Sequence, residues 1–234
     1  MDFSKISVVG LGYIGLPTAA MFASRGIEIV GVDINPDVVA TINSGGIHII
    51  EPDLDAVVYK SVNDGKLRAT LTPEASQAFL IAVPTPISHD TLDPNLDYIQ
   101  AATNSIAPVI ERGNLVVLES TVPVGTTEKL CRWLSVKRPD LTFPDTHGEA
   151  SDIRIAHCPE RVLPGRVMQE LIENDRLIGG MTERCANLAK ELYSIFVRGE
   201  CVIASSPRTA ELAKLTENSF RDVNIAFANE LSII

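Results

Sequence analysis

Three glycines with the spacing Gly-x-Gly-x-x-Gly lie near the start of the chain, at Gly10, Gly12 and Gly15. They follow an apolar run at 5–10 and overlap the start of an uncharged segment, 13–24, that is typical of a buried helix. In such a position the first glycine makes a tight turn, the second lets a ligand approach the backbone, and the third lets helix and strand pack closely. The motif predicts a strand, a turn and a helix in direct succession.

A carboxylate follows the second apolar run, which ends at Asp33, 18 residues after the third glycine. In dinucleotide-binding folds an acid at this place accepts hydrogen bonds from the adenosine ribose, and its charge repels a 2'-phosphate. No arginine follows in the segment INPD, so NAD is favoured over NADP, with phosphate on the N–H groups near Tyr13 and Ile14. The alternative is that the glycines only form a turn and that Asp33 only helps to cap the next helix, through Asn35 and Pro36.

The apolar runs are continuous and alternate with amphipathic segments, as expected for strands buried on both faces and joined by helical crossovers. The pattern predicts an α/β fold, a Rossmann-type doubly wound, mostly parallel sheet followed by the start of a long central helix. Strands are expected at 5–10, 28–33, 79–83, 115–120, 154–158, 176–180 and 201–205. Helices are expected at 13–24, 37–44, 97–111, 126–136 and 183–197, and a surface loop at 139–152.

Residues 208–234 contain neither glycine nor proline and predict one continuous helix. We expect residues 1–206 to form the NAD-binding domain and 207–234 to begin a connecting and dimerisation helix. The positions Val223, Ala226, Phe227, Glu230 and Leu231 form an apolar seam interrupted by one charge, and either a further domain or a second copy is expected to pack on it. Because the pattern ends within an apolar run without a cap or polar tail, we expect the chain to be part of a longer protein.

Composition excludes several classes of function. Lysine and arginine number 20 against 30 acidic residues, so the net charge is −10, which disfavours a nucleic-acid partner. The four cysteines are widely spaced and form no zinc-ligand pattern, so no bound metal is expected. Their small number and wide spacing are typical of a protein from a reducing compartment. The uncharged stretch 6–24 is interrupted by glycines and Pro17, which argues against a membrane span, and a cytoplasmic protein is expected.

Polar side chains follow the later strands. Thr85 lies in VPTP, Thr121 and Thr126 lie in ESTVPVGTT, and Glu160 and Arg161 lie in CPERVLPG. Because ligands bind beyond the carboxyl ends of strands in open α/β sheets, these residues are expected at one edge. Taken singly, threonines and prolines at such places also occur in ordinary turns.

The final helix carries Lys214, Asn218 and Arg221, which are four and then three residues apart and share one helical face. A lysine beside a carboxamide can hold and protonate an alkoxide, and a partly desolvated lysine has a pKa shifted toward neutrality. The alternative is a solvated face on which Glu211 and Glu217 pair with the cations, and the spacing alone favours that alternative.

The motifs, taken together, indicate a protein family as well as a fold. In chain order they are GLGYIGLPTA, DINP, VPTP, ESTVPVGTTE, CPERVLPG, IGG and AELAKLTENSFRDVNIAFANE. This set resembles the UDP-glucose/GDP-mannose dehydrogenase family over essentially the whole chain. The PERVLPG form and the closing helix most resemble the members that act on UDP-N-acetyl-D-mannosamine in bacterial surface-polysaccharide synthesis.

The resemblance implies oxidation of the sugar C6 alcohol to a carboxylate, here UDP-N-acetyl-D-mannosaminuronate, with two NAD molecules and no release of the aldehyde. It also implies a homodimer built through the central helix and a UDP-sugar substrate. UDP-glucose and UDP-N-acetylglucosamine are alternative substrates, because the sequence does not show which sugar epimer is accepted.

Carried over by motif, the resemblance also implies roles for individual residues. Lys214 would be the acid/base and oxyanion partner with Asn218 assisting, while Glu160 and Thr121 would position or activate the water that hydrolyses a thioester. NAD contacts are implied for the glycine-rich turn and for Tyr13, Ile14, Asp33, Thr85 and Thr126. Contacts with the nucleotide sugar are implied for Arg161, Val162, Lys214, Asn218 and Arg221.

The family's nucleophile is a cysteine in a G-G-H-C segment after the long helix, and none of Cys131, Cys158, Cys185 and Cys201 matches it. We therefore expect that nucleophile and a second, UDP-sugar domain beyond Ile234, and we expect this chain alone to bind NAD without forming a uronate. Two other classes stay open. One is a cofactor-binding or dimerisation module without turnover, and the other is a relative of the 3-hydroxyacid or 6-phosphogluconate dehydrogenases, which PERVLPG and ESTVPVG disfavour.

Overall fold

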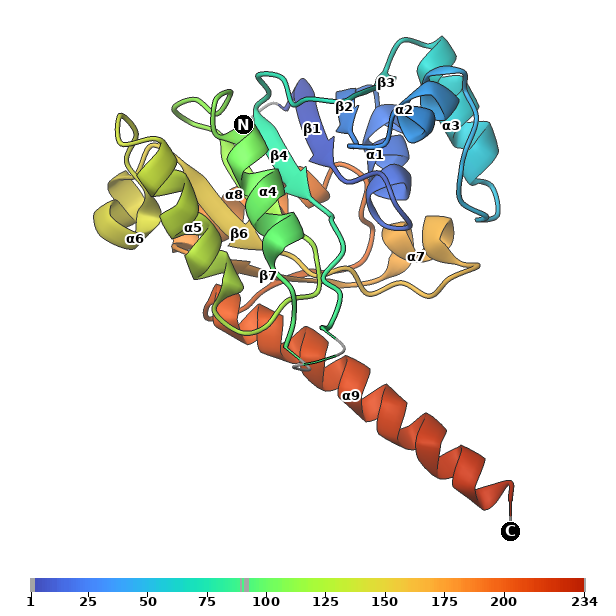
Figure 1. The fold of residues 1–234 in the computed structure, drawn as a ribbon. Coiled ribbons are helices and arrows are strands. Elements are labelled where there is room, and N and C mark those ends of the chain that lie inside the picture. The colour runs from blue at the N-terminus through green and yellow to red at the C-terminus, as the bar shows by residue number, and fades with distance from the viewer. Residues whose placement is uncertain (1–2, 89, 91–92, 234) are drawn as a thin grey trace.

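The computed structural model describes residues 3–88, 90 and 93–233. Within them eight strands form one twisted sheet in the order β3-β2-β1-β4-β5-β6-β7-β8, with helices on both faces (Figure 1). The strands are β1 Lys5–Val9, β2 Glu28–Val32, β3 Leu67–Thr70, β4 Ala78–Ile81, β5 Leu115–Leu118, β6 Arg154–His157, β7 Arg176–Gly180 and β8 Cys201–Ile203. The helices are α1 Gly15–Ser24, α2 Pro36–Asn43, α3 Leu54–Asn63, α4 Asp97–Ile106, α5 Thr126–Lys137, α6 Pro144–His147, α7 Val167–Glu173, α8 Glu183–Tyr193 and α9 Pro207–Leu231.

The sheet is buried on both faces, as the continuous apolar runs predict. In β4, for example, Ala78 and Leu80 pack into one core, while Phe79 and Ile81 pack into the other. Helices α1, α3, α7 and α8 contribute to the first core, and α4 and α5 contribute to the second. The Rossmann-type α/β fold class is therefore confirmed.

Strand β1 lies where the direction of winding reverses. It pairs in parallel with β2 on one side and with β4 on the other. The chain leaves β1 through α1 on one face of the sheet and leaves β4 through α4 on the other, which opens a crevice beyond the carboxyl ends of β1 and β4. The glycine-rich turn at Gly10–Gly15 lies directly after β1 and therefore at this crevice.

Several elements depart from the sequence prediction. The apolar runs gave no sign of β3, α3 or α7, because all three segments are only partly buried and β3 and α7 are also short. The predicted sheet was mostly parallel, without a direction for each strand, and the structure shows that β7 pairs antiparallel with β6. Its preceding helix, α7, packs against α1 and does not cross the sheet, so the chain returns in the opposite direction. The expected loop 139–152 contains α6 and a short 3-10 helix, Gly148–Ala150.

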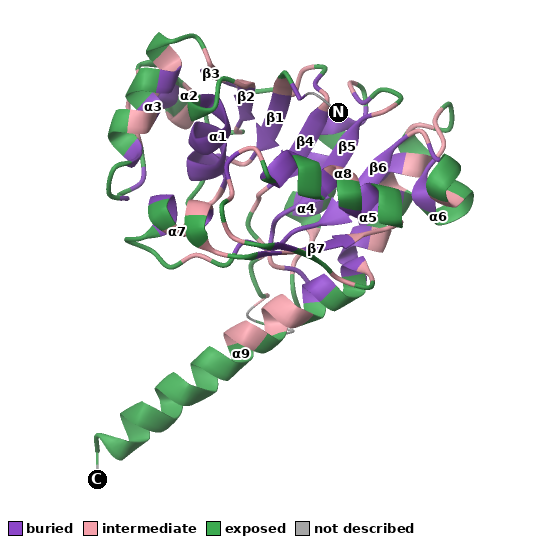
Figure 2. Ribbon diagram, turned by 180° about the vertical axis from the view of Figure 1, so that it is seen from behind, coloured by how far each residue is buried: buried purple, intermediate pink, exposed green. Residues whose placement is uncertain are grey.

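Helix α9 begins with Pro207 at its first position, and the Ser206 hydroxyl accepts a hydrogen bond from the Thr209 N–H at 3.2 Å. Its first turns contact β6 and β7, whereas its second half extends away from the sheet and is exposed (Figure 2). The predicted end of this helix, at Ile234, lies outside the described residues. In the part of the chain that the structure describes, no helix combines the length and the apolar character that a membrane crossing requires.

Candidate active site

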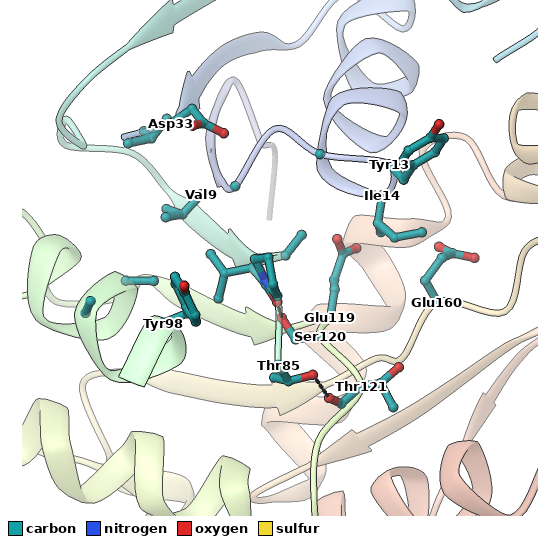
Figure 3. Close-up of a pocket in the computed structure, with 18 of the residues that line it drawn as sticks. Val9, Tyr13, Ile14, Asp33, Thr85, Tyr98, Glu119, Ser120, Thr121 and Glu160 are labelled. Atoms are coloured by element: carbon teal, nitrogen blue, oxygen red, sulfur yellow. Dashed lines mark hydrogen bonds between the residues drawn. The ribbon is translucent and has the colours of Figure 1, made fainter. Parts of the chain in front are cut away.

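A cavity of about 750 Å³ lies beyond the carboxyl ends of β1, β2, β4, β5 and β6 (Figure 3). One end is formed by Asp33 and Ile34, and the other by Glu119, Glu160 and Lys214. Most of the residues proposed from the sequence line this single space. The proposed residues in its wall are Gly10, Gly12, Tyr13, Ile14, Asp33, Thr85, Thr121, Glu160, Val162 and Lys214.

The three glycines of the turn have three different reasons for lacking a side chain. Gly10 has φ +91°, and a Cβ there would lie 2.5 Å from the Ala82 carbonyl oxygen. A Cβ on Gly15 would lie 1.7 Å from the Gly10 carbonyl oxygen, so this glycine lets α1 approach the turn. A Cβ on Gly12 would meet nothing within 4 Å and would project into open space. Backbone and open space at this turn fit the diphosphate of NAD.

The N-terminus of α1 is available to an anion. Its N-cap residue is Ile14, and no side chain among the described residues caps it. Uncapped N–H groups and the positive end of the helix dipole favour phosphate at this place. Tyr13, which is half exposed, flanks the same opening in Figure 3.

Asp33 faces the turn, and it does not cap α2. Its Oδ2 accepts a hydrogen bond from the Leu11 N–H at 3.0 Å, and its Oδ1 accepts one from the Asn35 N–H at 3.0 Å. Asn35 is the residue that caps α2, because its Oδ1 accepts from the Asp37 N–H at 2.9 Å. The Asp33 carboxylate is therefore fixed beside the glycine turn, where an adenosine ribose is expected.

Hydroxyl groups tie the ends of β4 and β5 together. The Thr85 hydroxyl donates to the Thr121 carbonyl at 2.7 Å, and the Ser120 hydroxyl donates to the Val83 carbonyl at 2.7 Å. Thr126 lies elsewhere: it is fully buried at the start of α5, and its hydroxyl donates to the Pro123 carbonyl at 2.7 Å. The structure thus places Thr85 and Thr121 at the cavity and Thr126 outside its lining.

Glu160 is held by a buried ion pair that the sequence analysis missed. Its Oε2 is paired with the guanidinium of Arg176 at the start of β7, and its Oε1 accepts from the Arg161 N–H at 2.8 Å. The Arg176 guanidinium also lies 5.2 Å from the centroid of the Tyr193 ring. An arginine that opens an apolar strand was the available signal, but its partner is 16 residues away and no local spacing reveals it.

A second buried carboxyl group, that of Glu119, lies on the same wall. The Tyr193 hydroxyl donates to its Oε1 at 2.6 Å. Burial raises the pKa of Glu119 to about 7, with the negative charge of Glu160 acting in the same direction and Arg176 in the opposite one. Glu119 is the first residue of the ESTVPVGTT segment, and no local pattern in the sequence marks it as a site residue.

Lys214 reaches the cavity from α9. Burial lowers the pKa of its amine, while the negative charges of Glu160 and Glu217 oppose that shift. Among the described residues it has no ion-pair partner within 4 Å. The alternative of a solvated, salt-bridged face does not hold for Lys214, because Glu217 pairs with Arg161 at 2.5 Å and Glu211 binds the start of α5.

The other residues proposed on α9, Asn218 and Arg221, are outside the lining of the cavity. The Arg221 guanidinium donates to the Asn218 Oδ1 at 2.9 Å, so these two side chains do share a helical face. Arg161, on the loop after β6, joins this face through its pair with Glu217. The structure therefore brings Lys214 into the cavity wall, whereas Asn218, Arg221 and Arg161 are not part of that wall.

Two family models match the chain. Residues 4–197 match the UDP-glucose/GDP-mannose dehydrogenase family, NAD binding domain, and residues 208–234 match the central domain of the same family. This chain belongs to the UDP-glucose/GDP-mannose dehydrogenase family. It therefore contains the family's NAD-binding domain, and the resemblance noted from the motifs is confirmed.

Individual relatives are similar over the full chain. It is 63% identical to a UDP-N-acetyl-D-mannosamine dehydrogenase of Campylobacter jejuni, covering 100% of this chain and 57% of the relative. It is 64% identical to an NDP-N-acetyl-D-galactosaminuronic acid dehydrogenase of Ralstonia nicotianae, covering 100% and 55%. A structure of UDP-D-ManNAc dehydrogenase from Pyrococcus horikoshii has a TM-score of 0.89 at 48% identity, covering 97% of this chain and 52% of that one. The chain thus spans about half the length of these relatives.

Proposed function

We propose that this chain forms the NAD-binding half of a nucleotide-sugar 6-dehydrogenase, which oxidises the C6 alcohol of UDP-N-acetyl-D-mannosamine to the carboxylate of UDP-N-acetyl-D-mannosaminuronate. One observation carries the proposal: Lys214 lines the same cavity as the glycine turn and Asp33. The choice of sugar is supported by the 63% identity to the UDP-N-acetyl-D-mannosamine dehydrogenase of Campylobacter jejuni.

Oxidation of an alcohol requires a base for the hydroxyl proton, and NAD, when bound, supplies the acceptor for the hydride. Lys214 is the base we assign, because burial lowers the pKa of its amine and increases the neutral fraction. After it has taken the proton, its ammonium group stabilises the negative charge that develops on the substrate oxygen. Glu160, on the same wall, helps to keep that ammonium group in the cavity by its opposite charge.

We assign Glu160 and Thr121 to the orientation of water in a later hydrolytic step. The ion pair with Arg176 restricts the Glu160 carboxylate to one position, and the Thr85 hydroxyl restrains the Thr121 backbone. The cysteines are not assigned a role. All four are buried, none of them lines the described cavity, and burial raises the pKa of the Cys131 thiol to about 12 and that of the Cys158 thiol as well.

A chimera tests the proposal. Residues 1–234 of this chain replace the matching half of the Campylobacter jejuni relative, and NADH formation is followed with UDP-N-acetyl-D-mannosamine, UDP-N-acetylglucosamine, UDP-glucose and UDP-N-acetylgalactosamine. We expect the first sugar to give the highest kcat/KM. A higher kcat/KM with UDP-N-acetylgalactosamine would contradict the assigned sugar and favour a substrate of the kind indicated by the name of the Ralstonia nicotianae relative. A chimera that folds and oxidises none of the four would contradict the proposal.

The same chimera tests the base. Lys214→Ala is expected to lower kcat by about 100- to 10,000-fold, as loss of a general base does, with NAD affinity changed by less than about twofold. The control is Lys190→Ala, which removes an exposed lysine from α8 and is expected to leave kcat unchanged. Turnover at the wild-type rate in Lys214→Ala would remove Lys214 from the mechanism.

We also propose that two copies pair through the exposed half of α9. Phe220, Val223, Phe227 and Leu231 recur along one side of this helix, and Phe220 and Phe227 are 71% and 63% exposed. A second copy is the occupant we assign, because the same stripe on both chains is self-complementary about a two-fold axis. Sedimentation equilibrium is expected to give a dimer that Phe227→Glu converts to a monomer, and a monomeric wild-type chain would contradict the assignment.

A further inference from the structure

Glu119 carries a buried oxygen atom that lacks a hydrogen-bond partner. The residue follows β5, is 2% exposed and lines the cavity. Its Oε1 accepts from the Tyr193 hydroxyl, whereas its Oε2 has no hydrogen-bond partner among the residues that the structure describes. Figure 3 shows the carboxyl group directed into the cavity beside Ile14, with Glu160 beyond Ile14 in that view. A buried acceptor in this state costs folding free energy and indicates a partner from outside the chain.

The surroundings leave the charge of Glu119 uncompensated. The single buried cation near it, among the described residues, is Arg176, which is already paired with Glu160. Tyr193 and Cys158 are neutral at physiological pH, because burial raises the pKa of both groups. Lys214 is the remaining titratable group at this end of the cavity. The groups that face Glu119 from β6, β7, α8 and α9 are thus Cys158, Glu160, Arg176, Tyr193 and Lys214.

The two ends of the cavity suit different parts of the cofactor. Asp33 fixes the adenosine end, and the turn at Gly12 receives the diphosphate, so the other nucleoside extends toward the ends of β4, β5 and β6. Glu119 lies at that end, on the opposite side of the turn from Asp33. The ring of the oxidised cofactor carries one positive charge, and the ring of the reduced cofactor carries none. A buried carboxylate distinguishes the two, since a charge interaction is strong where water is excluded.

We propose that the unpaired Oε2 of Glu119 faces the nicotinamide ring and makes this cavity prefer positively charged NAD+ over neutral NADH. The inference rests on the proposed function only in placing NAD in this cavity. It assigns to Glu119 a part in cofactor binding that is separate from proton transfer by Lys214. It also accounts for the missing hydrogen-bond partner, because a cationic ring compensates the carboxylate without donating a hydrogen bond.

The preference of the cavity for NAD+ over NADH is expected to depend on pH. Burial raises the pKa of Glu119 to about 7, so below this pH the group is protonated and NAD+ must displace the proton in order to bind. Ionisation of Glu119 does not strengthen the binding of NADH, because the reduced ring carries no positive charge. The ratio of the dissociation constants, NADH over NAD+, is therefore expected to rise between pH 6 and pH 8.

Binding to the 234-residue chain tests this without turnover. Dissociation constants for NAD+ and NADH are measured by titration calorimetry at pH 6 and pH 8 for the wild-type chain, Glu119→Gln and Asp33→Asn. Glutamine keeps the shape and still accepts from Tyr193, so only the charge is lost. We expect Glu119→Gln to weaken the binding of NAD+ about tenfold at pH 8 and to change the dissociation constant of NADH by less than about twofold. We also expect this variant to abolish the effect of pH on the ratio of the two constants.

Asp33→Asn is the matched control, because it removes a carboxylate from the adenosine end and is expected to weaken NAD+ and NADH equally. Lys214 also titrates, but it is retained in Glu119→Gln, so loss of the pH effect in that variant assigns the effect to Glu119. If Glu119→Gln does not fold, the ratio is measured at pH 6 and pH 8 for Lys214→Ala, in which Lys214 cannot contribute: a rise supports the inference and a constant ratio overturns it. The inference is also overturned if Glu119→Gln weakens the binding of NAD+ and NADH equally, or if it does not weaken the binding of NAD+. A wild-type chain that binds neither cofactor overturns the proposed function and this inference together.

Discussion

The carboxylate of Glu211 on α9 accepts hydrogen bonds from both the backbone N–H and the hydroxyl of Thr127 at the start of α5, at 2.8 and 2.7 Å. Its other oxygen accepts from the Gly125 N–H at 2.5 Å. Residues 84 positions apart in the sequence are joined in this way. Because Lys214 lies one helical turn after Glu211, and Thr121 lies in the loop that leads into α5, this contact fixes one proposed active-site element relative to the other.

Replacing Glu211 by alanine is expected to lower the free energy of unfolding by about 2–4 kcal/mol, because three buried donors lose their acceptor at once. Urea denaturation followed by circular dichroism measures the change. The control is Glu230→Ala, near the exposed end of the same helix, with an expected change below about 0.5 kcal/mol. Equal stability of the two variants would show that Glu211 does not anchor α9.

Local patterns in the sequence predicted those features of the site that depend on residues close together in the chain. The glycine spacing requires close backbone approaches, and the structure contains them at Gly10 and Gly15. Burial of strands on both faces follows from uninterrupted apolar runs, so the crevice and its position were predictable. Lys214 was identified by helical spacing, which places side chains on a face but does not show what that face contacts.

Contacts between distant segments could not be predicted in the same way. Arg176 reads as one polar residue at the start of an apolar strand, and only the antiparallel direction of β7 brings it beside Glu160. Tyr193 reads as a core aromatic at the end of a helix, and its hydroxyl meets Glu119 across 74 positions. A single sequence contains no signal for such pairs, because the energy that selects them arises from burial of the assembled fold.

Asp33 is expected to determine the choice between NAD and NADP. Asp33→Asn removes the negative charge and retains an oxygen that accepts from the Leu11 N–H. We expect NAD+ to bind about tenfold more weakly and NADP+ to bind more tightly than to the wild-type chain, since the 2'-phosphate is no longer repelled. Both constants are measured by calorimetry. Asp37→Asn, an exposed change of equal charge in α2, is expected to alter neither, and an unchanged preference in Asp33→Asn would exclude Asp33 from cofactor selection.

The buried pair of Arg176 and Glu160 is expected to show strong coupling. Arg176→Met leaves the Glu160 carboxylate buried without a counter-charge, which is expected to cost about 3–5 kcal/mol of unfolding free energy. The double variant Arg176→Met with Glu160→Gln is expected to recover more than about 1 kcal/mol of that loss. Urea denaturation of the wild type, both single variants and the double variant measures the coupling.

An exposed pair provides the comparison for that cycle. Arg208 is paired with Glu128 at 3.1 Å on the surface, and Arg208→Met is expected to cost less than about 1 kcal/mol because solvent screens the interaction. If the losses caused by Arg176→Met and Arg208→Met were equal, the buried pair would not be what holds Glu160 in place.

Two buried groups give the stability of the chain opposite dependences on pH. Burial lowers the pKa of His157 from 6.5 to about 3, and both of its ring nitrogens lack a partner among the described residues. The unfolded chain therefore binds the extra proton, and stability is lost as the pH falls from about 6.5 toward 3. Burial raises the pKa of Glu119 from 4.5 to about 7, so here the folded chain binds the extra proton and stability is lost as the pH rises from about 4.5 to 7.

Between pH 4.5 and 6.5 the two effects are expected to cancel, because each changes the free energy of unfolding by roughly 1.4 kcal/mol per pH unit and the signs are opposite. His157→Leu removes one effect and is expected to give a chain whose stability falls from pH 4.5 to 7. Glu119→Gln removes the other and is expected to give a chain whose stability rises from pH 4.5 to 6.5. Urea denaturation at half-unit intervals measures the three profiles. Parallel profiles for the wild type and both variants would mean that neither group changes its protonation on folding, which is incompatible with the burial of both side chains.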